Sequence, residues 1–156
     1  MGNEKDSGSG GTERVIATLN SLIETCKDGE EGFRTAAEGV SDQAVKTAFA
    51  KIARERWQMA RELQDEVQGL GGNPETSGSV GGAVHRGWIN IKSVVTGRDD
   101  QKIIAEAERG EDVAKAAFKA ALEEPLPAQV RALVERLAAE VRAAHDQVRA
   151  MEKSAR

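Results

Sequence analysis

Four long stretches of this chain repeat apolar residues at three- and four-residue steps, the spacing that lines one face of an α-helix. The clearest stretch follows Pro127, a residue suited to a first helical position, and runs to Met151 with charged residues opposite. Its apolar positions are Val130, Leu133, Val134, Leu137, Ala138, Val141, Ala144 and Val148. His145 lies within the same stripe, so this predicted helix carries an imidazole toward the interior.

The other three stretches predict helices over residues 12–38, 42–70 and 100–124. Their predicted N-caps are Thr12, Ser41 and either Asp99 or Asp100. Glycine or proline follows each helix, as is typical of helix ends. Gly29 and Gly32 lie inside the first helix, where they either allow a close approach or introduce a kink.

Residues 71–98 form the one long connection, between the second and third helices. Val80, Val84, Trp88, Ile91 and Val95 recur there at helical spacing, which predicts a helical crossover. The pattern as a whole predicts an all-α four-helix bundle with one long helical crossover, in which the second and third helices are parallel. An up-down-up-down bundle is the alternative topology.

Composition narrows the class of protein. The 156 residues suit a single domain over 12–156, while residues 1–11, rich in glycine, serine and charge, predict a disordered tail. A net charge of −4 gives no reason to expect nucleic acid, and no apolar run is long enough to span a membrane. The absence of an apolar signal segment and the single cysteine, Cys26, indicate a cytoplasmic location.

Several segments resemble an uncharacterised bacterial family of ferritin-like four-helix bundles: LNSLIETCKDGEEGFRTAAE, GSVGGAVHRGWINIK, TGRDD, ERGEDVAKAAFKAALE and HDQVRAM. The resemblance covers almost the whole chain after Thr12 and implies no particular activity. Better-known ferritin-like proteins imply a di-iron or di-manganese carboxylate site. They also imply assembly along the crossover side, so we expect a homo-oligomer, with a dimer favoured.

The ligand motif of that site is absent from the sequence. The pattern requires a glutamate from each of two helices and Glu-x-x-His from each of the other two. Glu55 is followed at the third position by Gln58, and Glu140 by Ala143. His145 lies five residues past Glu140, outside the required spacing.

Polar residues nevertheless interrupt the apolar face of each helix. Helical angles direct Glu30, Arg56, Glu111 and His145 inward, with Lys115 at the edge of its stripe. Burying any of them alone would cost several kcal/mol, so each must find a partner. Their depths along the helices predict two pairs, Glu30 with His145 and Arg56 with Glu111.

Two interpretations of these residues remain open. In one, Glu30, Glu111 and His145, with Glu55 as a fourth ligand, bind iron or manganese for an oxidase or storage activity. In the other, the buried polar network comprises Glu30, Arg56, Glu111, Lys115 and His145. The charge count favours the network, and with it a non-enzymatic bundle of stress-related or oligomer-forming type. A DNA-protecting ferritin relative is the least favoured class, because the tail has no basic cluster.

The remaining chemistry-bearing residues have simpler interpretations. His85 is expected to be a surface or packing histidine of the crossover, and Cys26 a small buried apolar residue. The acid-rich run 106–112 is expected to be a solvated helix face. Trp57 and Trp88 are expected to cover a seam beside the crossover or between subunits.

Overall fold

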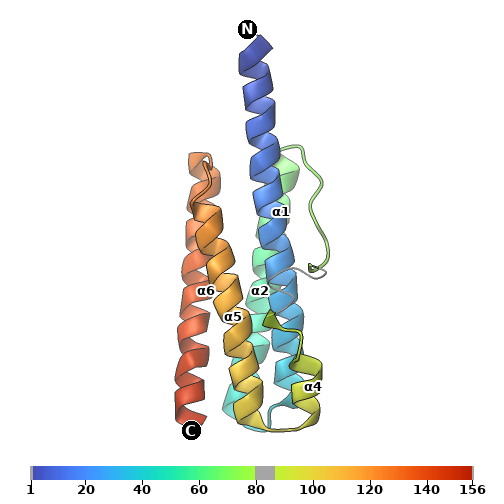
Figure 1. The fold of residues 1–156 in the computed structure, drawn as a ribbon, viewed down its shortest axis with the longest axis vertical. Coiled ribbons are helices and arrows are strands. Elements are labelled where there is room, and N and C mark those ends of the chain that lie inside the picture. The colour runs from blue at the N-terminus through green and yellow to red at the C-terminus, as the bar shows by residue number, and fades with distance from the viewer. Residues whose placement is uncertain (1, 80–86, 156) are drawn as a thin grey trace.

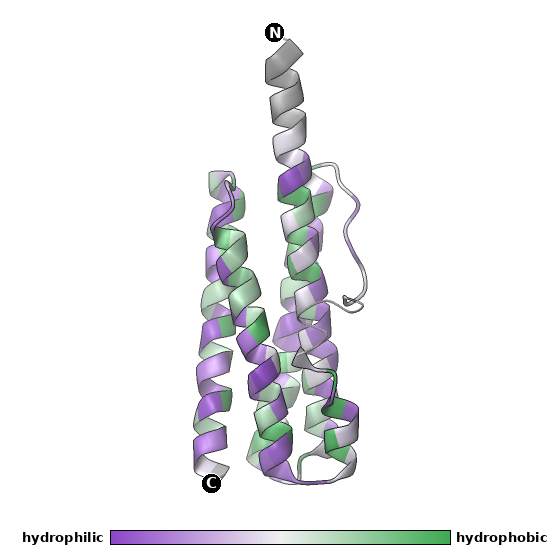
Figure 2. Cartoon of the chain, viewed as in Figure 1, coloured by the Kyte–Doolittle hydropathy of each residue, from purple (hydrophilic) through white to green (hydrophobic). Residues whose placement is uncertain are grey.

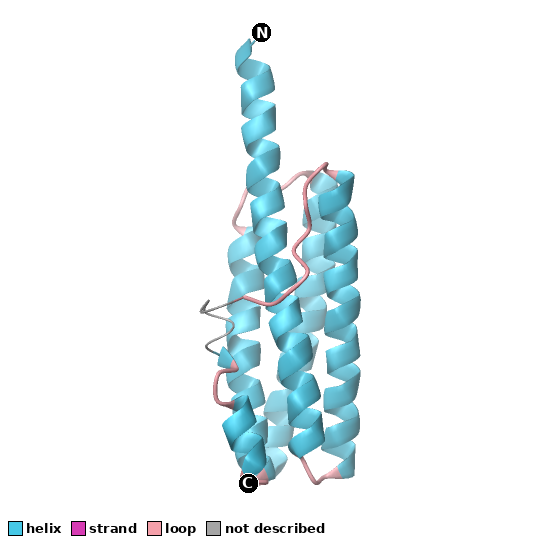
Figure 3. Cartoon of the chain, turned by 90° about the vertical axis from the view of Figure 1, so that its right-hand side faces the viewer, coloured by secondary structure: helices cyan, strands magenta, loops and turns pink. Residues whose placement is uncertain are grey.

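The computed structural model describes residues 2–79 and 87–155, and every regular element in these ranges is a helix. Four long helices form the bundle, and a short one precedes the third of them (Figures 1 and 3). They are α1 (Gly2–Gly39), α2 (Gln43–Gly69), α4 (Ile91–Thr96), α5 (Asp100–Leu122) and α6 (Ala128–Ala155). The predicted all-α bundle is confirmed. None of the described helices combines the length and the apolar character that crossing a membrane requires.

The starts of α2 and α5 lie at the same end of the bundle. The Asp100 carboxylate accepts hydrogen bonds from the backbone N–H groups of Ser41, at 2.8 Å, and Asp42, at 2.9 Å. Burial would raise the pKa of Asp100, but these hydrogen bonds outweigh it and hold that pKa below its usual value. Helices α2 and α5 therefore run parallel, as predicted. Because α1 packs against α2 and α5, and α6 against the same two helices, α2 is diagonally opposite α5.

The helix ends follow the predicted chemistry with small shifts. Asp42, one residue after the predicted Ser41, caps α2 by accepting a hydrogen bond from the Val45 N–H at 3.0 Å. Gly71 ends α2 with a φ of +86°, and the N–H groups of Gly71 and Gly72 bond back to carbonyls of the last turn. This left-handed glycine cap explains why the helix stops there.

The crossover follows α1 back along the bundle. Asn20 of α1 donates a hydrogen bond to the Asn73 carbonyl and accepts one from the Glu75 N–H, so residues 73–75 lie against that helix. The apolar spacing predicted a helix over much of this connection. Of the described crossover residues, Gly87 and α4 are helical and the others form loop and turns. Residues 80–86, with His85, lie outside the described residues.

Helix α1 begins at Gly2, ten residues before the predicted N-cap Thr12. Its N-terminal end projects beyond the other helices (Figure 1). No atom of another part of the chain lies within 4 Å of a Cβ built at Gly10 or Gly11. The backbone is helical from Gly2 onward, and the predicted mobility of residues 1–11 stays a prediction.

The interior contains two apolar clusters, one toward each end of the bundle. Hydrophilic and apolar residues alternate along each long helix, as amphipathic packing requires (Figure 2). One cluster comprises Val15, Leu19, Leu22, Ile23, Cys26, Met59, Ala60, Leu63, Val67, Ala114, Phe118, Ala121, Val130, Val134, Leu137, Ala138 and Val141. The other comprises Phe33, Ala36, Ala37, Val40, Phe49, Ile52, Ala53, Trp88, Ile91, Ile103, Ile104, Ala107, Ala144 and Val148.

Candidate functional site

A polar layer separates the two apolar clusters. We give this name to Glu30, Arg56, Glu111 and His145, one residue from each long helix. On α1, α2 and α5 the polar residue lies in sequence between members of the first cluster and members of the second, whereas on α6 His145 lies between Ala144 and Val148, both of the second cluster. All four side chains are buried, as the helical periodicity predicted.

The centre of the layer is an ion pair between diagonally opposite helices. Arg56 Nη1 donates to Glu111 Oε1 at 2.6 Å, and Nη2 donates to Oε2 at 2.5 Å. The side chain of Arg56 is 1% exposed and that of Glu111 is 0% exposed. The predicted pairing of these two residues is therefore formed, in the bidentate geometry that a guanidinium and a carboxylate favour.

The surroundings of Arg56 are shaped to receive it. A Cβ at Gly29 would lie 3.0 Å from Arg56 Nη1, so this glycine leaves room for the guanidinium beside α1. The Arg56 guanidinium carbon lies 5.6 Å from the centre of the Phe33 ring, within cation–π range. Burial alone would lower the pKa of Arg56, but the Glu111 carboxylate outweighs it and raises that pKa. Arg56 is therefore a permanent positive charge in the core.

The second predicted pair, Glu30 with His145, is not formed. Glu30 lies 3.0 Å from Lys27 Nζ and 3.5 Å from Arg34 Nη2, both on its own helix. His145 Nε2 instead lies 2.6 Å from Asp112 Oδ1. The pair does not form because α1 and α6 are not packed against one another. Glu30 instead has Lys27 and Arg34 within one helical turn on α1.

The predicted metal ligands do not converge. Glu55 is only half-buried and lies 4.0 Å from Lys51, while Glu111 is held by Arg56. Lys115, assigned to the edge of its stripe, is exposed and takes no part in the layer. The residues present do not fit the di-iron or di-manganese centre that the ferritin-like resemblance implies.

A different group of ligand-type side chains meets at the edge of the bundle. Among the described residues, Glu108, Asp112 and His145 bring one donor atom each to within 4.8 Å of one another. The sequence pattern did not predict this group, because the run 106–112 was expected to be a solvated helix face. That expectation is wrong for Glu106, which is buried, whereas Glu111 of the same run is buried as its helical angle predicted. The signal available was the four-residue step from Glu108 to Asp112, which aligns both carboxylates on one face of α5.

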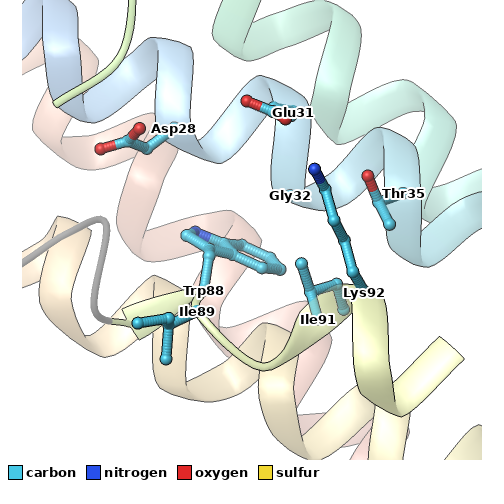
Figure 4. Close-up of a pocket in the computed structure, with 8 residues that line it drawn as sticks. All are labelled: Asp28, Glu31, Gly32, Thr35, Trp88, Ile89, Ile91 and Lys92. Carbon is cyan, nitrogen blue, oxygen red and sulfur yellow. The ribbon is translucent and has the colours of Figure 1, made fainter. Parts of the chain in front are cut away.

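Trp88 fixes the crossover to the bundle. A Cβ at Gly32 of α1 or at Gly110 of α5 would overlap its indole ring, which therefore lies between these two helices. Beside it is a pocket of about 240 Å³ between α1 and the crossover, with Glu31 and Lys92 on opposite walls (Figure 4). Trp88 covers the seam predicted for it, whereas Trp57 is 46% exposed.

These features define the class of protein as an all-α bundle with a charged pair in its interior. The family model described as a domain of unknown function, DUF2383, matches residues 14–124. Since the match covers more than half of the chain, the chain belongs to this family, and the predicted membership of an uncharacterised family is confirmed. The matched region contains Arg56 and Glu111 and ends before α6, which carries His145. No curated protein matches the chain.

Proposed function

We propose that this protein is a non-enzymatic, ferritin-like bundle protein whose polar layer determines how its helices assemble. The observation that carries the proposal is the bidentate Arg56–Glu111 pair. It occupies the interior, where a core metal would need free carboxylate oxygens and no competing cation. The parallel order of α2 and α5, joined by a long crossover, supports the ferritin-like part of the proposal.

The pair favours one alignment of α2 with α5, because any other alignment would bury two unpaired charges. If α2 slid by one turn against α5, the guanidinium and the carboxylate would both be buried without a partner. Removing one member of a buried ion pair typically costs about 3–5 kcal/mol, because the remaining charge is uncompensated. The pair therefore selects one alignment of the two diagonal helices over others that bury similar apolar area.

A double-mutant cycle tests this role. We expect Arg56→Met and Glu111→Leu each to lower the free energy of unfolding by about 3–5 kcal/mol, and the double variant to recover most of the loss. Urea unfolding followed by circular dichroism measures the three values. The matched control is the pair of Arg136 and Glu62, which are 3.2 Å apart, with the Arg136 side chain 52% exposed. Arg136→Met should lower the free energy of unfolding by at most about 1 kcal/mol. Additive losses at Arg56 and Glu111 would contradict the proposal.

The alternative function is a carboxylate and histidine metal protein with oxidase or storage activity. It requires Glu111 to exchange Arg56 for iron or manganese, with Glu30, Glu55 and His145 moving to join it. Anaerobic Fe(II) and Mn(II) titrations of an Asp112→Asn variant isolate the interior, because that substitution removes a carboxylate of the group at the bundle edge. Stoichiometric binding that Glu111→Gln abolishes would overturn the non-enzymatic proposal in favour of this alternative.

We also propose a cytoplasmic homodimer. The lone cysteine, Cys26, is buried and unpaired, which suits a reducing compartment. Trp57 on α2 and Ile89 beside α4 are exposed large apolar residues of the described chain, and such residues gather at interfaces between subunits. Sedimentation equilibrium of the wild type and of Trp57→Ser tests the dimer, which fails if the wild type is monomeric at all concentrations.

A further inference from the structure

We infer that one divalent transition-metal ion binds at the edge of the bundle, between Glu108, Asp112 and His145. We call these three residues the edge site. The inference stands apart from the role proposed for the Arg56–Glu111 pair, because none of the three residues belongs to that pair. It rests on the geometry of donor atoms contributed by two neighbouring helices, α5 and α6.

The donor atoms are close to the spacing that a metal requires. Glu108 and Asp112 lie one turn apart on α5, and His145 faces them from α6. Their donor atoms lie within 4.8 Å of one another, whereas ligands of a tetrahedral ion are about 3.3 Å apart. Glu108 is half-exposed and Asp112 exposed, so rotation of these side chains can close the difference without disturbing the core.

His145 is oriented as a ligand before any metal arrives. Its side chain is 5% exposed, and its Nε2 atom faces Asp112. Its other ring nitrogen, Nδ1, lies 3.4 Å from Asp146 Oδ1. A carboxylate on the far nitrogen is the arrangement that holds metal-binding histidines in place. A metal bound at Nε2 would replace the hydrogen that the 2.6 Å contact with Asp112 requires, while Nδ1–H stays donated to Asp146.

A competing interpretation uses the same contacts without a metal. A protonated imidazole would donate one N–H to Asp112 and the other to Asp146. The role of Glu108 separates the two interpretations, since it is part of the ligand group and makes no contact required by the protonated imidazole. A variant of Glu108 therefore reports on metal binding and leaves the histidine's hydrogen bonds intact.

The donor set selects the class of ion. One imidazole nitrogen with two carboxylate oxygens suits Zn²⁺, Fe²⁺ and Mn²⁺, whereas Mg²⁺ and Ca²⁺ prefer oxygen ligands alone. Asp112 is 60% exposed, so water can complete the coordination. The order of divalent affinities places Zn²⁺ above Fe²⁺ and Mn²⁺. An ion bound here would also join α5 to α6 and stabilise that hairpin.

Zn²⁺ titration of the chelator-treated full chain by calorimetry tests the site. We expect one ion per chain, a rise in the unfolding temperature, and affinity reduced about tenfold or more in Glu108→Gln and in Asp112→Asn. His85→Ala, which changes the only other histidine, and Glu135→Gln, at an exposed carboxylate of α6, are the controls and should bind as the wild type does. The affinity for Mg²⁺ should be lower than that for Zn²⁺ by a factor of at least about ten.

Three results would overturn the inference. They are no Zn²⁺ binding at about 100 µM, binding unchanged in the Glu108→Gln and Asp112→Asn double variant, and binding lost in His85→Ala but kept in His145→Ala. Co²⁺ in place of Zn²⁺ gives a visible spectrum that His145→Ala should abolish. Because His145 is buried, circular dichroism must show that this variant folds, and if it does not fold, Glu108→Gln and Asp112→Asn decide.

Discussion

Burial changes the chemistry of Cys26, the single cysteine of the chain. The side chain is fully buried in the first apolar cluster. Burial raises the pKa of its thiol from 9.0 to about 12, although the nearby Arg56 charge acts in the opposite direction. The thiol is therefore protonated and inert in the native protein, in agreement with its expected role as a small apolar residue.

The raised pKa makes stability depend on pH through this one residue. Above about pH 9 the unfolded chain releases the thiol proton while the native chain keeps it, so rising pH favours unfolding. We expect the stability advantage of the wild type over Cys26→Ala to shrink by about 1.4 kcal/mol between about pH 8 and about pH 10. Urea unfolding of both proteins measures it. A difference that is constant with pH would show that Cys26 ionises in the native state as readily as in the unfolded one.

Single residues show which part of the site the sequence could predict. The direction of each polar side chain follows from helical angle alone, and Glu30, Arg56, Glu111 and His145 are all buried. Partners depend on which helices are neighbours and on side-chain rotamers, neither of which the periodicity contains. The predicted pairing of Arg56 with Glu111 is formed, whereas the predicted pairing of Glu30 with His145 is wrong.

At the scale of elements, Trp88 anchors the crossover between α1 and α5. Gly32 and Gly110 are its two contact points, since a side chain at either position would overlap the indole. Of the two roles predicted for Gly32, a close approach or a kink, the contact with Trp88 supports the close approach. Gly32 and Gly110 leave room for the side chain of Trp88 to enter between α1 and α5.

Gly110→Ala should therefore destabilise the protein although alanine is the better helix former. We expect a loss of about 2 kcal/mol from overpacking against Trp88. Gly69→Ala is the matched control, because a Cβ at Gly69 meets nothing within 4 Å. That substitution should leave stability unchanged or raise it by up to about 1 kcal/mol. Thermal unfolding of both variants gives the comparison, and equal effects would contradict the close contact.

The long helices and the helical character of Ile91–Thr96 could be predicted from the sequence, whereas the position of Trp88 could not. Four stripes and their caps locate α1, α2, α5 and α6, with the largest error at the start of α1. In the crossover, apolar spacing predicted helix, but Trp88 lies in a turn ahead of α4. The position of Trp88 is set by the gap between two helices distant in sequence, which no local pattern contains.

At the scale of the whole molecule, the polar layer and the crossover both help to select one arrangement of the four long helices. Four amphipathic helices can bury similar apolar area in more than one arrangement. The Arg56–Glu111 pair links the diagonal helices α2 and α5, and Asp100 joins their starts. The crossover passes along α1 and inserts Trp88 between α1 and α5. Together these contacts favour one topology, in which α2 and α5 are parallel.

The N-terminal end of α1 lies outside this network. Residues 2–11 include Gly2, Gly8, Gly10 and Gly11, which weaken a helix, and the segment projects from the bundle (Figure 1). A glycine-rich segment at a projecting end of a helix should fray in solution. We expect its amides to exchange with deuterium about as fast as an unfolded peptide, while those of α1 beyond Val15 are strongly protected. Hydrogen exchange with mass spectrometry makes the comparison. Protection that appears only at high protein concentration would instead show that a second copy of the chain covers this segment, and would place it in the proposed dimer interface.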